Sequence, residues 1–376
     1  MRVLLAPDKF RGTFTASQVC AHLARGMKRT SPDIVVLEHP LADGGEGTLE
    51  ALLAACGGTS HILEVHGPLG EPVEALYGVA PDGTALLESA RFCGLGLVPP
   101  GSRDPMRASS RGLGEAVAAC LDAGLRRFLI GLGGSATVDG GTGMARALGF
   151  RFLERGGEEI RGVGSDLPAI VRIDGSMAHP GLAEASFTVL HDVDNPVLGP
   201  SGAAIVYGPQ KGASPADLLV LEAGLEHVVS ACAHWGGQDP STLAMLPGGG
   251  AAGGLGLACR TFLGALLRPG APFLLERLSF ADRLAEADLV VTGEGSFDAQ
   301  SLQGKVAARV IEAAAGLGLP AALVAGRWDG SLPARRPAIM RVFTGSDLAE
   351  GGGQLDAQAL SELGGRIVAW ARSGPG

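Results

Sequence analysis

Residues 127–143 read RFLIGLGGSATVDGGTG, an apolar run that passes into a glycine-rich turn. The run 127–130 predicts a buried strand, and the segment 144–150 is compatible with a helix. Together they suit anion binding, because glycine lets backbone N–H groups approach a phosphate and a helix N-terminus adds partial positive charge. The alternative is a tight turn that only needs small residues. We favour the anion site because similar loops recur along the chain.

The first of these loops follows an apolar strand predicted at residues 2–6. It carries Asp8, Lys9 and Arg11, three charged residues within four positions. Open α/β sheets bind ligands beyond the carboxyl ends of their strands, which is where this loop would lie. A solvated charged turn is the alternative.

Two more loops follow the predicted strands 34–37 and 186–190. The first places Asp43 before two glycines, and the second carries Asp192 and Asp194. Carboxylates at a strand end are suitable ligands for Mg²⁺. The alternative for the second loop is an Asx turn closed by an Asn-Pro pair.

Two later segments complete the set. The predicted strand 288–291 runs into a glycine-rich loop with Glu294 and Asp298. Residues 246–256 contain six glycines and could form a flexible linker or a phosphate-binding loop. Linkers usually carry serine and charge, whereas this segment carries alanine and leucine, so we favour the phosphate-binding loop.

Composition narrows the class of protein. Of 376 residues, 46% are hydrophobic and 18% charged, which excludes wholesale disorder. A net charge of −9 without a basic stripe argues against nucleic acid as a partner. The six cysteines form no CxxC pair, so neither a zinc site nor a disulfide framework is indicated. No signal peptide or membrane-length run is recognisable, and we expect a cytoplasmic monomer or homodimer that binds no membrane.

The order of the predicted strands and helices indicates two α/β domains. Strands and helices alternate near both ends, whereas the middle contains a strand hairpin around residues 81–83. We therefore expect a discontinuous Rossmann-like domain with a parallel sheet, formed by residues 1–66 plus 282–376. A mixed α/β domain, residues 67–281, would be inserted in it, with a cleft between the two.

Glycine-rich loops with charged residues at several strand ends suit phosphoryl transfer, where a protein positions groups and stabilises charge. The chain has no Walker loop and no protein-kinase motif set. No G-x-G-x-x-G follows the first strand, which disfavours a nicotinamide enzyme. The residues alone therefore indicate phosphate chemistry on a small molecule.

Six segments resemble the signature blocks of the bacterial glycerate kinase family, in family order and over nearly the whole chain. They are APDKFRG (6–12), PLADGGEGT (40–48), GLGGSATVDGGTG (131–143), DVDNP (192–196), YGPQKG (207–212) and TGEGSFD (292–298). The resemblance implies ATP- and Mg²⁺-dependent phosphorylation of D-glycerate, usually at the 2-hydroxyl. The chain departs from the family pattern at Arg11, where lysine is usual, and at Ser296, where arginine is common.

With this resemblance, we assign roles as hypotheses. Lys9 and Arg11 would bind the glycerate carboxylate or the transferred phosphoryl group. Asp192 would be the catalytic base, with Asp43 as its rival. Further substrate-binding residues would be Asp8, Glu294 and Asp298, and the metal ligands would be Asp192 and Asp194. The residues expected to bind the phosphates of ATP are Gly133, Gly134, Ser135, Thr137, Asp139, Lys211, Gly249, Gly250, Gly253 and Lys305.

Three alternatives remain open at this point. One is a kinase that acts at the 3-hydroxyl or on a related sugar acid. Another is an enzyme of different chemistry, such as a sugar-acid isomerase or dehydrogenase. The last is a metabolite sensor without activity, which the retained acidic residues at the strand ends disfavour.

Overall fold

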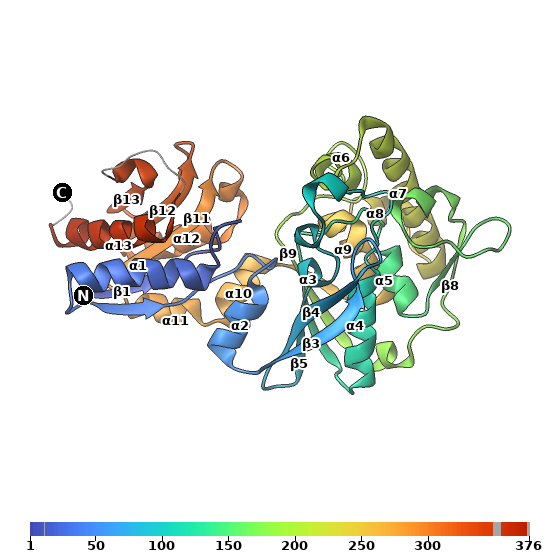
Figure 1. The fold of residues 1–376 in the computed structure, drawn as a ribbon, viewed down its shortest axis with the longest axis horizontal. Helices are drawn as coiled ribbons and strands as arrows, with labels where there is room; N and C mark the ends of the chain where they lie inside the picture. Colours follow the sequence, from blue (N-terminus) through green and yellow to red (C-terminus); the bar gives the residue numbers. More distant parts are fainter. Residues whose placement is uncertain (11, 349–354, 374–376) are drawn as a thin grey trace. The chain divides into compact units, whose positions relative to one another are not determined.

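The computed structural model describes residues 1–10, 12–348 and 355–373 (Figure 1). The chain forms two compact units. The first comprises Met1–Asp43, Glu50–Ala55 and Ala271–Gly376, and the second comprises Gly44–Leu49 and Cys56–Gly270. One unit is thus assembled from both ends of the chain.

The first unit is built on a five-stranded sheet whose strands all run parallel, in the order β13-β12-β11-β1-β2. The strands are β1 (Arg2–Leu5), β2 (Val35–Glu38), β11 (Leu289–Phe297), β12 (Ala321–Trp328) and β13 (Met340–Phe343). Both faces of such a sheet must be covered, which explains the nearly continuous apolar runs in its strands.

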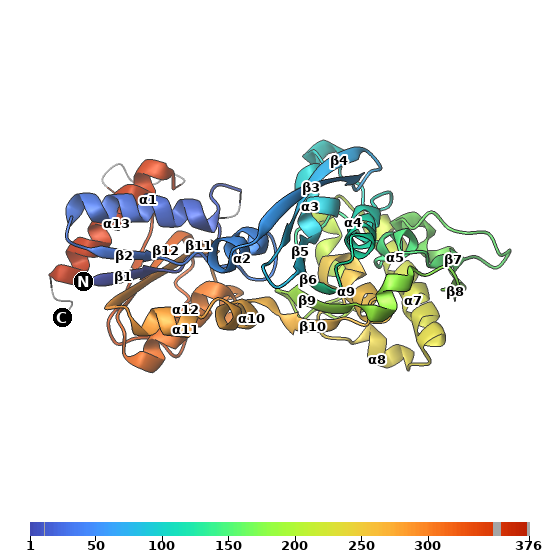
Figure 2. The same ribbon diagram turned by 90° about the horizontal axis from the view of Figure 1, so that it is seen from below.

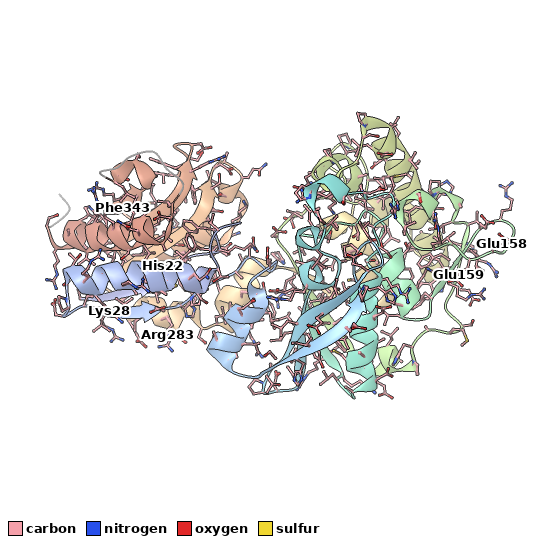
Figure 3. The ribbon with its side chains drawn as sticks, in the orientation of Figure 1. His22, Lys28, Glu158, Glu159, Arg283 and Phe343 are labelled. Carbon is pink, nitrogen blue, oxygen red and sulfur yellow. The ribbon has the colours of Figure 1, made fainter. Side chains whose placement is uncertain are left out.

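Helices cover both faces of this sheet (Figure 2). On one face lie α1 (Ala16–Thr30) and α13 (Ala357–Arg372), and on the other lie α11 (Phe280–Ala285) and α12 (Val306–Leu317). Phe343, labelled in Figure 3, is fully buried at the end of β13. Its ring centroid lies 5.8 Å from that of Trp370 in α13. The predicted parallel sheet is confirmed.

One helix differs from the prediction. A single helix was expected over residues 276–286, but the chain forms α10 (Gly270–Arg277) and then α11. Ser279 separates the two helices with a φ of 52°, in the left-handed region. A non-glycine residue cannot continue a right-handed helix from that conformation, so the helix breaks there.

The second unit contains a six-stranded mixed sheet in the order β10-β9-β6-β5-β4-β3. Its strands are β3 (Thr59–His66), β4 (Pro72–Val79), β5 (Thr84–Glu88), β6 (Arg127–Leu132), β9 (Ser186–His191) and β10 (Leu266–Pro269). The first three form the predicted antiparallel part, and β5, β6, β9 and β10 run parallel. The mixed α/β class predicted for this part of the chain is confirmed.

Most of the remaining elements of this unit are helices. They are α2 (Thr48–Cys56, shared between the units), α3 (Ser89–Cys93), α4 (Arg111–Asp122), α5 (Thr142–Ala147), α6 (Ala203–Tyr207), α7 (Pro215–Gly236), α8 (Pro240–Ala244) and α9 (Ala251–Phe262). A small two-stranded sheet joins β7 (Arg151–Leu153) to β8 (Arg172–Asp174). Among the described residues, we find no helix that combines the length and the apolar character needed to span a membrane.

The edges of the units differ from the expected domain limits. Strand β3 was expected in the first domain, but it pairs with β4 along its whole length and so belongs to the second unit. Conversely, residues 271–281 belong to the first unit. The order of predicted strands and helices does not show which strands pair, which explains why the predicted domain limits differ from the limits of the two units.

Candidate functional site

The topology of the first sheet directs attention to the loops that follow β1, β2 and β11. Strand β1 lies between the other two, and the chain order reverses at this place in the sheet. Ligands of open parallel sheets bind beyond the carboxyl ends of the strands at such a switch point. The loops after β1 and β2, together with the carboxyl-terminal half of β11 itself, carry three of the predicted acidic residues.

These residues are Asp8, Asp43 and Glu294. Asp8 is only 6% exposed, and its backbone N–H donates to the Gly293 carbonyl at 2.9 Å. Burial, followed by the nearby charge of Asp43, raises the pKa of Asp8 well above its usual range. Burial also raises the pKa of Glu294, whose Oε1 is buried without a hydrogen-bond partner. Carboxyl groups with shifted pKa values are typical of sites that bind or deprotonate a ligand.

Two lysines lie against this carboxylate cluster. Lys9 Nζ is 3.6 Å from Asp43 Oδ1, and Lys305 Nζ is 3.9 Å from Glu294 Oε2. The structure therefore brings together five of the predicted residues: Asp8, Lys9, Asp43, Glu294 and Lys305. Such an array offers both cations for an anionic group and carboxylates for hydroxyl groups.

Asp298 and Arg11 were also predicted for this part of the site. Asp298 accepts hydrogen bonds from the backbone N–H groups of Gln300 and Ser301 at 2.9 and 3.2 Å, so it closes a local turn. Arg11 lies outside the described residues. Their roles in substrate binding stay predictions.

The second unit holds a buried cation against the glycine-rich loop that follows β6. Lys211 is 3% exposed and lies on the 3-10 turn Pro209–Lys211. Its Nζ donates to Ser135 Oγ at 2.9 Å and to the Thr137 carbonyl at 2.7 Å. Both acceptors are neutral, and in the described part of the chain no carboxylate forms an ion pair with Lys211. The Thr137 hydroxyl is buried without a partner. An anionic ligand would supply the missing charge and acceptor.

Burial lowers the pKa of Lys211 from 10.5 to about 8. Below pH 8 the lysine is charged in both states, so the cost of burying the charge is fully present. Between pH 8 and 10.5 the folded protein releases a proton that the unfolded chain keeps, so stability rises with pH. Relative to Lys211→Met, we expect wild-type protein to gain about 3 kcal/mol across this range. Urea unfolding of both proteins from pH 7 to 10.5 measures the difference; parallel curves would contradict it.

The hydrogen bonds that Asp139 accepts stabilise the protein itself. Asp139 is fully buried, and its Oδ2 accepts from both the backbone N–H and the hydroxyl of Ser110 at 2.7 Å. The backbone N–H groups of Gly141 and Gly143 donate to it at 3.0 and 3.3 Å. Burial raises the pKa of Asp139 while these bonds oppose the rise. The carboxylate thus ties the starts of α4 and α5 together, which explains its presence without a phosphate.

The glycines of the two glycine-rich loops also have protein neighbours. A Cβ on Gly253 would lie 2.0 Å from the Thr137 carbonyl oxygen, and one on Gly250 would lie 2.1 Å from the Pro196 carbonyl. The Gly133 N–H donates to Ser89 Oγ at 3.1 Å. These glycines therefore let backbone segments pack closely. Phosphate binding by Gly133, Gly134, Gly249, Gly250 and Gly253 stays a prediction.

Gly253 provides a test of this packing. It has a φ of 76°, so alanine there would combine backbone strain with the clash against Thr137. We expect Gly253→Ala to lower the free energy of unfolding by about 3 kcal/mol or more. Gly264→Ala is a matched control, because Gly264 has a φ of 62° but open space around it, and should cost about 1 kcal/mol. Equal losses in the two variants, measured by urea unfolding, would contradict the packing role.

The proposed metal ligands lie on the surface. Asp192 is exposed, and the side chain of Asp194 is 79% exposed, with its Oδ1 3.6 Å from His191 Nδ1. The described residues contain no group of three histidine, cysteine or carboxylate side chains able to hold a metal ion. Since Mg²⁺ often takes one or two carboxylates and completes its shell with substrate phosphates and water, these aspartates fit only that kind of partial site.

Sequence reasoning missed a buried ion pair at the end of β5. Glu88 is 1% exposed and accepts from Arg91 Nε at 2.7 Å and from the Leu49 N–H at 2.8 Å. The apolar run 85–87 precedes Glu88, as apolar runs precede the other charged segments. No glycine lies between Glu88 and Arg91, so the pattern that singled out the other segments is absent here.

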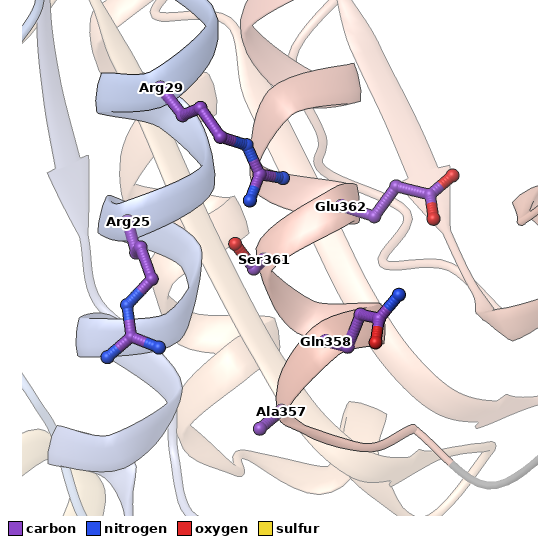
Figure 4. Close-up of a pocket in the computed structure, with 6 residues that line it drawn as sticks. All are labelled: Arg25, Arg29, Ala357, Gln358, Ser361 and Glu362. Carbon is purple, nitrogen blue, oxygen red and sulfur yellow. The ribbon is translucent and has the colours of Figure 1, made fainter.

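Two cavities lie away from the predicted residues. One, of about 650 Å³, lies between α1 and α13 and is lined by Arg25, Arg29, Ala357, Gln358, Ser361 and Glu362 (Figure 4). The other, of about 470 Å³, lies beside β3 and includes His66 and Glu115, whose Nδ1 and Oε1 are 2.8 Å apart. Neither contains a residue of the groups described above.

The parallel sheet with its carboxylate and lysine cluster, and the mixed sheet with its buried lysine, define an α/β enzyme that handles a small anionic substrate. Comparison with known sequences is more specific. The profile of the Glycerate kinase family matches residues 3–361, and the chain belongs to this family.

Named relatives agree with this membership. Glycerate kinase of Halalkalibacterium halodurans is 41% identical over 325 residues, covering 86% of this chain and 85% of that protein. Glycerate 2-kinase of Escherichia coli K12 is 41% identical over 310 residues, covering 81% and 80%. The crystal structure named for glycerate kinase 2 of Salmonella typhimurium LT2 superimposes with a TM-score of 0.81 at 36% identity, over 100% of this chain and 99% of that one.

Proposed function

We propose that the protein transfers the γ-phosphoryl group of ATP to the 2-hydroxyl of D-glycerate, giving 2-phosphoglycerate and ADP. The observation that carries this proposal is the family match over residues 3–361, together with 41% identity to a glycerate 2-kinase. The geometry supports it through groups suited to an anionic, hydroxyl-bearing substrate and to phosphates.

The buried lysine of the second unit would bind the phosphates of ATP. Lys211 has only neutral partners, Ser135 and the Thr137 carbonyl. A buried charge without a counter-ion is costly, and a phosphate oxygen would offset that cost. The unpartnered Thr137 hydroxyl would donate to a second phosphate oxygen.

The cluster at the carboxyl end of β1 would bind glycerate. Lys9 would bind the carboxylate, while Asp43 would accept the proton of the reacting hydroxyl. Support for Asp43 over Asp192 comes from its surroundings, because its side chain is 13% exposed beside Lys9, whereas Asp192 is exposed. A positioned base needs a site sheltered from water, where its proton transfer is not diverted.

Mg²⁺ would enter with ATP, and Asp192 and Asp194 would contribute carboxylates to its shell. The ion would neutralise phosphate charge when bound. Localisation in the cytoplasm, and a monomeric or dimeric state without nucleic-acid or membrane partners, remain part of the proposal.

The decisive experiment is an assay of ADP release with D-glycerate, with the product identified by ³¹P–¹H NMR. We expect 2-phosphoglycerate. Formation of 3-phosphoglycerate would overturn the assigned position, and turnover only with another sugar acid would overturn the assigned substrate. Absence of ADP release with any sugar acid would overturn the kinase proposal.

A further inference from the structure

The turn that carries Lys211 also lies against a second cation. Arg103 Nη1 is 3.5 Å from the carbonyl oxygen of Gln210, the residue before Lys211. The Arg103 carbonyl packs on Gly212, where a Cβ would lie 2.4 Å from its oxygen. Gly212 ends the turn with a φ of 100°. Close backbone contact therefore fixes the position of Arg103 relative to the turn.

Arg103 lacks a counter-charge within the described residues. Its side chain is half-buried, its Nε is buried without a hydrogen-bond partner, and no ion pair to a carboxylate is present. The neighbouring Asp104 faces its own backbone, because its Oδ1 accepts from the Met106 N–H at 3.0 Å. A guanidinium stays protonated in proteins, so this charge cannot be relieved by releasing a proton.

Two cations without an ion-pair partner among the described residues thus lie on adjoining backbone in the second unit, and the charge of Asp139 acts on Lys211 only from beyond ion-pair distance. Burial of unpaired charge is costly, and proteins normally pair such groups or reserve them for a charged ligand. The guanidinium fork matches a phosphoryl group bidentately, while an ammonium acts as a point charge. This combination fits two neighbouring phosphoryl groups better than a single carboxylate.

We propose that Arg103 is a second phosphate-binding residue, which together with Lys211 binds adjacent phosphoryl groups of a polyphosphate chain. The inference rests on the proposed function, because the polyphosphate would be that of ATP. It adds a residue that none of the glycine-rich motifs contains.

The test measures binding without turnover. Isothermal titration with inorganic tripolyphosphate compares wild type, Arg103→Gln, Arg103→Lys and, as a matched control on the same loop, the exposed Arg107→Gln. We expect Arg103→Gln to weaken binding about 10- to 100-fold, since hydrogen bonds to charged groups have this effect. Arg103→Lys should fall between, because it keeps the charge and loses the fork. Arg107→Gln should stay within about twofold of wild type.

Wild-type affinity in Arg103→Gln, or no tripolyphosphate binding by wild type, would overturn the proposal. A rise in the KM for glycerate with unchanged tripolyphosphate binding would also overturn it. If Arg103→Gln does not fold, as judged by its Tm, the result for Arg103→Lys decides. Wild-type affinity for tripolyphosphate in that variant would contradict bidentate phosphate binding by the Arg103 guanidinium. The binding test requires no turnover. If wild type does not phosphorylate glycerate but Arg103→Gln still binds tripolyphosphate more weakly than wild type, the phosphate site stands and only the substrate assignment fails.

Discussion

Replacing Lys211 by methionine is expected to lower kcat/KM for ATP by about 10²–10³-fold, the range seen when one donor to a transition-state charge is removed. Methionine has similar length but no charge, so the loss reports the ammonium group. Because the buried lysine has only neutral partners, Ser135 and the Thr137 carbonyl, its removal should not lower the free energy of unfolding at pH 7. Steady-state kinetics and urea unfolding test both halves of this prediction.

The combination of lost activity and retained stability is diagnostic. A lysine needed for packing would lose both, and retained activity would remove Lys211 from the phosphate site. The control is Lys28→Met on the exposed side of α1, which should leave kinetics and stability unchanged. Thr137→Val is a useful companion, because it removes a buried hydroxyl without a partner and should weaken ATP binding at no cost in stability.

Replacing Asp43 by asparagine is expected to lower kcat for glycerate phosphorylation by about 10²–10⁴-fold, the contribution typical of a positioned general base. Asparagine keeps the size and accepts hydrogen bonds but cannot take the proton of the hydroxyl. The KM for ATP should change little, since the loss lies in the chemical step. Stopped assays over a range of glycerate concentrations separate kcat from KM.

A second readout shows whether Asp43 lies where we place it. Its charge contributes to the raised pKa of Asp8, so Asp43→Asn should lower the pKa of Asp8 toward its usual range, as followed by NMR titration. Asp192→Asn is the comparison: we expect a higher Mg²⁺ requirement but less than about a tenfold loss of kcat at saturating Mg²⁺. The reverse ranking of the two variants would return the role of base to Asp192.

The charged segments at the carboxyl ends of the strands could be located from local sequence, because an apolar strand that ends in glycine and charged residues shows its own boundary. Asp8, Lys9, Asp43 and Glu294 were singled out in this way, whereas Lys211 was singled out only by the resemblance of its segment to a family motif. The ion pair of Glu88 with Arg91 was missed because no glycine separates the end of β5 from α3, and Arg103 was missed because it follows no predicted strand. The break at Ser279 was missed because no glycine or proline marks it.

By itself, the sequence determined the α/β class, the presence of a parallel sheet and of a strand hairpin, and the family, since apolar periodicity and motif order are local properties of the chain. Tertiary structure alone decided which polar groups face one another. Asp139 is bound by Ser110, 29 residues away, and Lys211 reaches Ser135 across 76 residues. Whether a glycine or a charge serves packing or a ligand depends on such distant partners, because close contact and loss of water are set by the neighbours in space.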